Sequence, residues 1–262
     1  QLVFEEVNWS GVLQPAEDDL GARLRAAGPF HYAKLREFML DFAADAIAYQ
    51  PTHTDRSAYD AIHAKVADGL DRLAARAGAR APLAVIGHSL GTVIASNYLY
   101  DLLKPRSSFM APEVRDRIGR TPIERGHTLT LLVTMGSPIA LWSLRYPDYG
   151  VPVTLPVKRL AAHHPDLEPR WINVYDPDDV IGYPLKPLNV RYQEAVTEDH
   201  PVDVGNWLTR WNPLSHTGYW NDGRIADLIA TDLAQAWRRS LAVALVTTKK
   251  SSVSRRRAAP SA

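Results

Sequence analysis

The stretch GHSLG at positions 87–91 carries the clearest chemical pattern in this sequence, because it is a G-x-S-x-G motif. It follows the apolar run Leu83–Ile86, which predicts a strand buried on both faces. It also opens a segment that predicts a helix from Leu90 to about Leu103. The motif is therefore expected on a sharp turn between a strand and a helix.

Such a turn suits nucleophilic chemistry. Strained backbone angles lift the serine hydroxyl out of the sheet, and the neighbouring residues must be small, as the two glycines are. The N–H of Leu90 stands at the start of the helix, where it can bind the negative oxygen of an attacked carbonyl group. The motif predicts Ser89 as a nucleophile and Leu90 as an oxyanion donor.

The run VIGHSLGTVIA at positions 85–95 resembles the nucleophile region of lipases and esterases in the α/β-hydrolase superfamily. The order of the predicted elements is similar to that family across most of the chain. The resemblance implies a serine esterase or lipase that needs no cofactor or metal. It also implies a triad in the chain order Ser, then Asp or Glu, then His.

The triad carboxylate is expected after the apolar segment Trp171–Tyr175. A serine needs an imidazole base, and the imidazole needs a carboxylate to orient it and stabilise its charged form. The stretch DPDD at positions 176–179 resembles the acid turn of the family, with Asp179 the best match and Asp178 a close second. Asp176, which precedes a proline, is expected to cap the turn. An alternative interpretation treats all three as turn residues on a solvated loop.

His216 is the predicted base among nine histidines, because it stands in a loop just before the final predicted helix, where the resemblance also places it. His200 competes, but the acids beside it favour a surface turn. His63 lies on the apolar stripe of a helix and is expected to be a buried, hydrogen-bonded core residue. His88, inside the motif, is expected to shape the wall of the pocket.

Ser137 is a weaker nucleophile candidate. It belongs to the stretch MGSP at positions 135–138, which resembles a sequence that lipase-like proteins carry after this strand. No G-x-S-x-G motif surrounds it, so a turn that lets the following segment cross the site is the favoured interpretation.

A second oxyanion donor has no clear source in the sequence. The family has a His-Gly or Gly-rich loop after an early strand, and none occurs here. Either the stretch WSG at positions 9–11 supplies this donor, or upstream strands that carry it precede this chain. The second explanation is favoured, because Phe4–Val7 leading into a helical region is similar to the strand that follows such a loop. The sheet would then have an open edge.

The predicted elements alternate between strands and helices. Strands are expected at Leu2–Val7, Leu83–Ile86, Thr128–Thr134, Trp171–Tyr175 and, more weakly, Val190–Glu194; helices are expected from Pro15 to Gly28, His31 to Tyr49, Asp55 to Gly78, Leu90 to Leu103 and Asn221 to Ala242. This order predicts an α/β three-layer sandwich, a mostly parallel sheet with helices on both faces. Its sites belong at the carboxyl ends of the strands.

The domain organisation follows from length and local composition. The 262 residues fit one domain over 1–248, with lid-like Pro-rich insertions at about 104–127 and 146–170. The basic segment 249–262 is predicted to be disordered.

Composition narrows the class of partner. Thirty basic and 29 acidic residues give a net charge of +1, which argues against nucleic acid as a partner. The absence of cysteine excludes thiolate chemistry. No apolar run is long enough for stable membrane insertion, and a cytoplasmic location is expected. The expected partner is a small-molecule ester or lipid. Alternatives are an acyltransferase or thioesterase on the same fold, or a catalytically silent binding protein.

Overall fold

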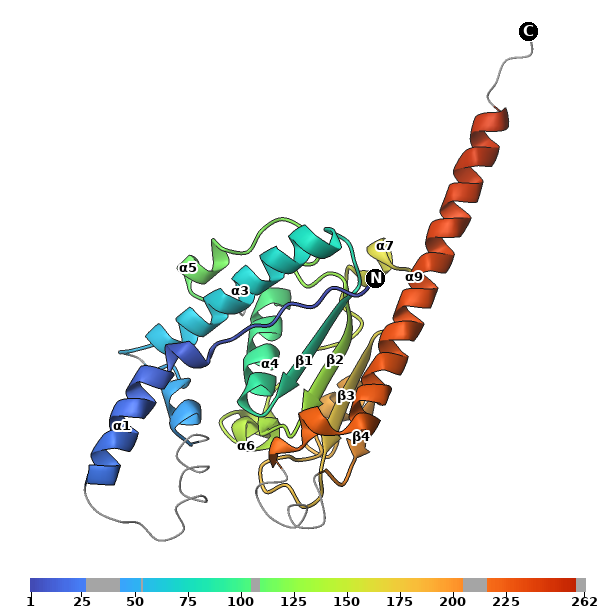
Figure 1. Cartoon of the computed structure of the whole chain (residues 1–262). Helices are drawn as coiled ribbons and strands as arrows, with labels where there is room; N and C mark the ends of the chain where they lie inside the picture. Colours follow the sequence, from blue (N-terminus) through green and yellow to red (C-terminus); the bar gives the residue numbers. More distant parts are fainter. Residues whose placement is uncertain (27–42, 53, 105–108, 205–215, 258–262) are drawn as a thin grey trace.

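The computed structural model describes residues 1–26, 43–52, 54–104, 109–204 and 216–257 of the chain. A four-stranded parallel sheet lies at the centre of the fold (Figure 1). Its order is β1 (Leu83–His88), β2 (Leu129–Met135), β3 (Arg170–Tyr175) and β4 (Glu198–Pro201). Each neighbouring pair is parallel, so the carboxyl ends of all four strands meet at one edge of the sheet. The chain therefore has an α/β architecture.

The helices connect and cover these strands. They are α1 (Gln14–Ala26), α3 (Ser57–Ala77), α4 (Leu90–Leu103), α5 (Pro112–Arg115), α6 (Ile139–Ser143), α7 (Leu160–His163), α8 (Val190–Ala195) and α9 (Gly223–Arg257), with 3-10 turns η1 (Ser10–Val12), η2 (Pro147–Tyr149) and η4 (Tyr219–Asn221). Residues 43–48 are also helical. Among the residues described, no helix combines the length and the apolarity that crossing a membrane requires.

The sheet separates two groups of buried apolar side chains. One group joins Leu132 and Trp171 to residues of α3 and α4. The other joins Val133 and Ile172 to Ile225 of α9. Figure 1 shows the same arrangement, with α3 and α4 on one side of the strands and α9 on the other. All seven residues of β2 are buried, as expected of a strand covered on both faces.

The apolar runs predicted β1, β2 and β3 to within two residues at either end. An apolar stripe predicted α3, and the segment that follows the G-x-S-x-G motif predicted α4. Local signals define the ends of α3. The carboxylate of Asp55 accepts hydrogen bonds from the N–H and the hydroxyl of Ser57. Gly78 ends the helix at a φ of 93°, a left-handed conformation that glycine adopts without strain.

The prediction of a strand at Leu2–Val7 was wrong, because residues 1–9 have no regular secondary structure. This segment lies against α3 instead. Glu5 pairs with Arg72 and Arg76, which lie one helical turn apart on α3, at 2.5 and 2.9 Å. In the part of the chain that the structure describes, β1 is an edge strand of the sheet.

The weaker strand predicted at Val190–Glu194 was also wrong, since these residues form α8. Asn189 caps this helix, and its side-chain oxygen accepts the N–H of Tyr192 at 2.9 Å. The fourth strand is β4, which contains the stretch EDHP that the sequence had assigned to a surface turn.

The remaining predictions concern the last helix of the fold, an early helix and the two Pro-rich insertions. The helix α9 continues to Arg257, where disorder was predicted from 249 onward; Gly and Pro are absent between Gly223 and Pro260, which favours helix. The predicted helix His31–Tyr49 lies mostly outside the described residues. Insertion 104–127 leads from the end of α4 to β2, and insertion 146–170 contains η2 and α7. Their action as lids stays a prediction.

Candidate active site

Ser89 occupies the turn between β1 and α4 with a φ of 51° and a ψ of −131°. A residue other than glycine in such a conformation costs about 1–3 kcal/mol and persists only where its surroundings hold it. The N–H of Ser89 donates to the carbonyl of Met135 at 3.0 Å. A Cβ at Gly87 would lie 2.9 Å from the carbonyl oxygen of Gly91, so this glycine is required. A Cβ at Gly91 would meet open space, so the predicted need for a second small residue was wrong there.

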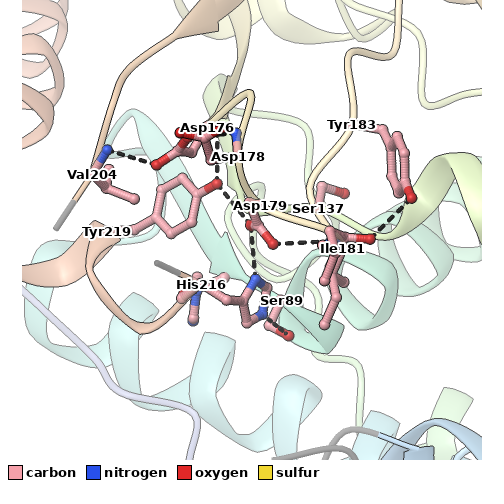
Figure 2. Close-up of polar contacts among 12 residues, drawn as sticks. Ser89, Ser137, Asp176, Asp178, Asp179, Ile181, Tyr183, Val204, His216 and Tyr219 are labelled. Carbon is pink, nitrogen blue, oxygen red and sulfur yellow. Dashed lines mark hydrogen bonds and ion pairs between the residues drawn. The ribbon is translucent and has the colours of Figure 1, made fainter. Parts of the chain in front are cut away.

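Ser89, His216 and Asp179 lie in one hydrogen-bonded chain (Figure 2). His216 Nε2 is 2.7 Å from Ser89 Oγ, across 127 positions of sequence. His216 Nδ1 is 2.8 Å from Asp179 Oδ2. The histidine and the carboxylate are each only 4% exposed, whereas Ser89 is partly exposed, so the reactive hydroxyl is the accessible end of the chain. The three residues predicted as a triad are brought together.

The two neighbouring acids have other positions, which resolves the choice between Asp178 and Asp179. Asp178 is exposed, and its N–H donates to Asp176 Oδ1 at 2.8 Å. Asp176 is buried and also accepts the N–H of Val204 at 2.7 Å. Asp176 therefore caps the turn, as predicted, and the alternative of three solvated turn residues was wrong.

Asp179 is held as a carboxylate. Burial alone would raise its pKa, but hydrogen bonds from His216, Ile181 and Tyr219, together with the charge of His216, lower the pKa below its usual range. Asp179 Oδ1 accepts the N–H of Ile181 at 2.9 Å, and Oδ2 accepts the Tyr219 hydroxyl at 2.8 Å. An ionised carboxylate stabilises the positive charge that the imidazole gains when it removes a proton.

Tyr219 joins the loop of the histidine to the loop of the acid, and nothing in the sequence had singled it out. Its hydroxyl accepts the N–H of Asp176 at 2.8 Å while it donates to Asp179. Burial and the neighbouring carboxylate raise the pKa of Tyr219, so the hydroxyl keeps its proton. Two glycines make room for this contact: a Cβ at Gly136 would lie 2.8 Å from the Tyr219 ring, and one at Gly182 would lie 2.7 Å from the carboxylate of Asp179.

His88 supports the base from the other side. Its Nε2 donates to the carbonyl oxygen of His216 at 2.8 Å, and the two ring centroids are 4.9 Å apart. Burial, reinforced by the nearby His216, lowers the pKa of His88 to about 4. His88 therefore stays neutral near pH 7 and adds no positive charge beside the base, a role more specific than the predicted pocket wall.

The competing histidines lie elsewhere. His200 is part of β4, and its Nδ1 is 2.7 Å from Glu198 Oε1. His63 is fully buried, and its Nε2 is 2.9 Å from the hydroxyl of Tyr49, as predicted for a hydrogen-bonded core residue. In the part of the chain that the structure describes, no group of three or more His, Asp or Glu has an arrangement that could hold a metal ion.

Of the two expected oxyanion donors, the N–H of Leu90 has a defined position. Leu90 is the first residue of α4, so its N–H has no acceptor within the helix and can point to a ligand. The stretch WSG at 9–11 overlaps η1, which contacts α1 and α3. A second donor from that stretch, or from upstream strands, stays a prediction.

Comparison of the chain with protein-family models, with curated proteins and with solved structures finds no match.

Proposed function

We propose that this protein is a serine hydrolase of the α/β-hydrolase type that cleaves carboxylic esters through an acyl-enzyme intermediate. The single observation that carries the proposal is the chain from Ser89 Oγ through both ring nitrogens of His216 to the carboxylate of Asp179. The parallel sheet, with the nucleophile turn directly after β1, supports the three-layer sandwich of that fold.

In the proposed reaction Ser89 attacks the ester, His216 moves the protons and Leu90 stabilises the negative oxygen. His216 Nε2 takes the proton of the Ser89 hydroxyl as Oγ attacks the ester carbonyl carbon. The Leu90 N–H binds the oxygen that becomes negative, at the positive end of α4. His216 then donates the proton to the leaving alcohol, which leaves an acyl group on Ser89. A water molecule, activated by the same histidine, releases the acid.

Replacing the nucleophile tests this proposal. We expect Ser89→Ala to lower the turnover of a p-nitrophenyl ester by about a millionfold while thermal unfolding stays close to wild type. Ser143→Ala is the matched control, because Ser143 lies outside the triad and its hydroxyl donates to the carbonyl of Ala140 within α6. Equal turnover in wild type and Ser89→Ala would contradict the proposal.

The same triad chemistry also applies to the cleavage of a thioester and to the transfer of the acyl group to an alcohol. Product analysis with an added alcohol separates hydrolysis, which gives the free acid, from acyl transfer, which gives a new ester. A folded wild-type protein without any turnover would favour the silent binding protein.

A further inference from the structure

A second hydrogen-bonded chain lies directly behind Ser89. Thr92 and Ser137 are both fully buried, the first in the opening turn of α4 and the second two residues after β2. Thr92 Oγ1 is 2.7 Å from the carbonyl oxygen of Ser89 and 2.7 Å from Ser137 Oγ. Ser137 Oγ in turn accepts the N–H of Ile139 at 3.3 Å.

The direction of every hydrogen bond in this chain is fixed. A carbonyl oxygen only accepts, so the Thr92 hydroxyl hydrogen points to Ser89. Thr92 Oγ1 can then only accept from Ser137, so the single hydroxyl hydrogen of that serine is donated to Thr92. Ser137 is thereby committed to a structural hydrogen bond, in contrast to Ser89, whose hydroxyl faces the imidazole of His216.

The bonded carbonyl shares a rigid peptide group with the predicted oxyanion donor. The carbonyl of Ser89 and the N–H of Leu90 belong to the same planar, trans peptide unit, in which they point in opposite directions. The carbonyl accepts two hydrogen bonds, from Thr92 N at 3.0 Å and from Thr92 Oγ1 at 2.7 Å. Whatever fixes this carbonyl also fixes the direction of the Leu90 N–H.

We propose that Thr92 and Ser137 are positioning residues that orient the peptide group between Ser89 and Leu90 and so aim the oxyanion N–H. The proposal rests on the proposed function of Ser89. The end of β2 and the loop after it reach both sides of this turn. The Ser89 N–H donates to the carbonyl of Met135, and the Thr92 hydroxyl that holds the Ser89 carbonyl accepts from Ser137. The MGSP stretch thus has a role that its turn alone does not explain.

Steady-state kinetics of ester hydrolysis test the proposal. We expect Thr92→Val to lower kcat about tenfold to a hundredfold, because a small misplacement of a catalytic donor has effects of that order. KM should stay within about twofold, since the donor acts on the transition state. Thr92→Ser keeps the hydroxyl and should restore kcat. Ser137→Ala should lower kcat less, and the double variant should be no slower than Thr92→Val, because Ser137 acts through Thr92.

A matched control separates orientation from packing. Thr128→Val makes the same change at a fully buried threonine whose hydroxyl has no partner among the residues described, and it should leave kcat unchanged. The shape of the pH profile should not change in Thr92→Val, because neither positioning residue titrates. A kcat for Thr92→Val equal to that of wild type would overturn the proposal.

Crystal structures of wild type and Thr92→Val give a readout that does not depend on turnover. The proposal predicts a rotated peptide group between Ser89 and Leu90 in the variant, and an unchanged orientation would overturn it. If wild type does not hydrolyse esters, the proposed function fails, and these two structures still decide whether Thr92 orients the peptide.

Discussion

Two buried histidines in this molecule have opposite surroundings. In the triad cluster (Ser89, Asp179, His216 and Tyr219), both ring nitrogens of the histidine have partners, and one partner is a carboxylate. In the tyrosine cluster (Tyr49, Tyr59, His63, Asn97 and Tyr98), which lies at the contact of α3 and α4, His63 Nε2 binds a tyrosine hydroxyl. Its Nδ1 has no partner within the part of the chain that the structure describes.

The difference shows that burial alone does not make a base. Burial, with a smaller contribution from Arg56, lowers the pKa of His63 to about 3, so this imidazole cannot hold a proton near pH 7. The centroid of its ring lies 4.0 Å from that of the Tyr59 ring, with the two planes tilted by 36°. The carboxylate of Asp179 gives His216 what His63 lacks, a negative charge that stabilises the imidazolium during a reaction.

Removing that charge gives the largest effect expected from this comparison. We expect Asp179→Asn to lower kcat by about 10⁴-fold, as the same change does in other serine triads, because the amide favours the wrong tautomer of the imidazole. Asp178→Asn is the control, since Asp178 is exposed and one residue away. The measurement is ester turnover of the two variants at pH 7 to 8. Equal effects at the two positions would contradict the assignment of the acid.

A smaller effect is expected from the hydroxyl that supports the acid. Tyr219→Phe removes a hydrogen bond to a carboxylate, and we expect kcat to fall about tenfold. The pKa of Asp179 should rise, because one of the groups that lower it is lost. Tyr98→Phe is the matched change in the tyrosine cluster, where the buried hydroxyl has no partner among the described residues. It should leave kcat unchanged, and an equal loss in both variants would break the comparison.

The smallest effect on activity is expected from replacing His63 in the tyrosine cluster. This replacement should change the pH dependence of the free energy of unfolding instead. As pH falls below about 6.5, the unfolded chain takes up a proton at His63, whereas the folded chain does not until about pH 3. The unfolded state binds more protons in this window, so the free energy of unfolding falls by about 1.4 kcal/mol per pH unit from this residue.

Urea unfolding of wild type and His63→Gln measures this contribution. Between pH 6.5 and 5 the loss of stability should be smaller in the variant by about 2 kcal/mol. Its kcat at pH 7.5 should stay within about twofold of wild type. Parallel stability curves for the two proteins would show that His63 titrates normally.

The parts of the fold and of the site that could be predicted are those whose signal lies within a few neighbouring residues of the sequence. The strands β1 to β3 are continuous apolar runs, and the GHSLG stretch specifies its turn within five residues. The strand β4 could not be recognised, because EDHP is short and polar. It pairs with β3 while Asp199 accepts the side-chain N–H of Asn173 and the backbone N–H of Leu185, contacts 26 and 14 positions away.

The contacts that support the site could not be predicted for a related reason. Tyr219 reaches Asp179 across 40 positions, His88 reaches His216 across 128, and Ser137 reaches Thr92 across 45. The two residues of each pair are far apart in the sequence, and they meet because the parallel pairing of β1, β2 and β3 brings the carboxyl ends of these strands to one edge of the sheet. The Asn189 cap of α8 was missed although it is local, because the sequence predicted a strand at Val190–Glu194.

Labelling of the folded protein with a fluorophosphonate probe, followed by mass-spectrometric mapping of the modified residue, tests most directly whether Ser89 is an activated nucleophile. We expect one modified serine, Ser89, with labelling lost in His216→Ala and retained in His200→Ala. Modification of Ser137 in place of Ser89, or no modification of a protein that unfolds cooperatively, would contradict it.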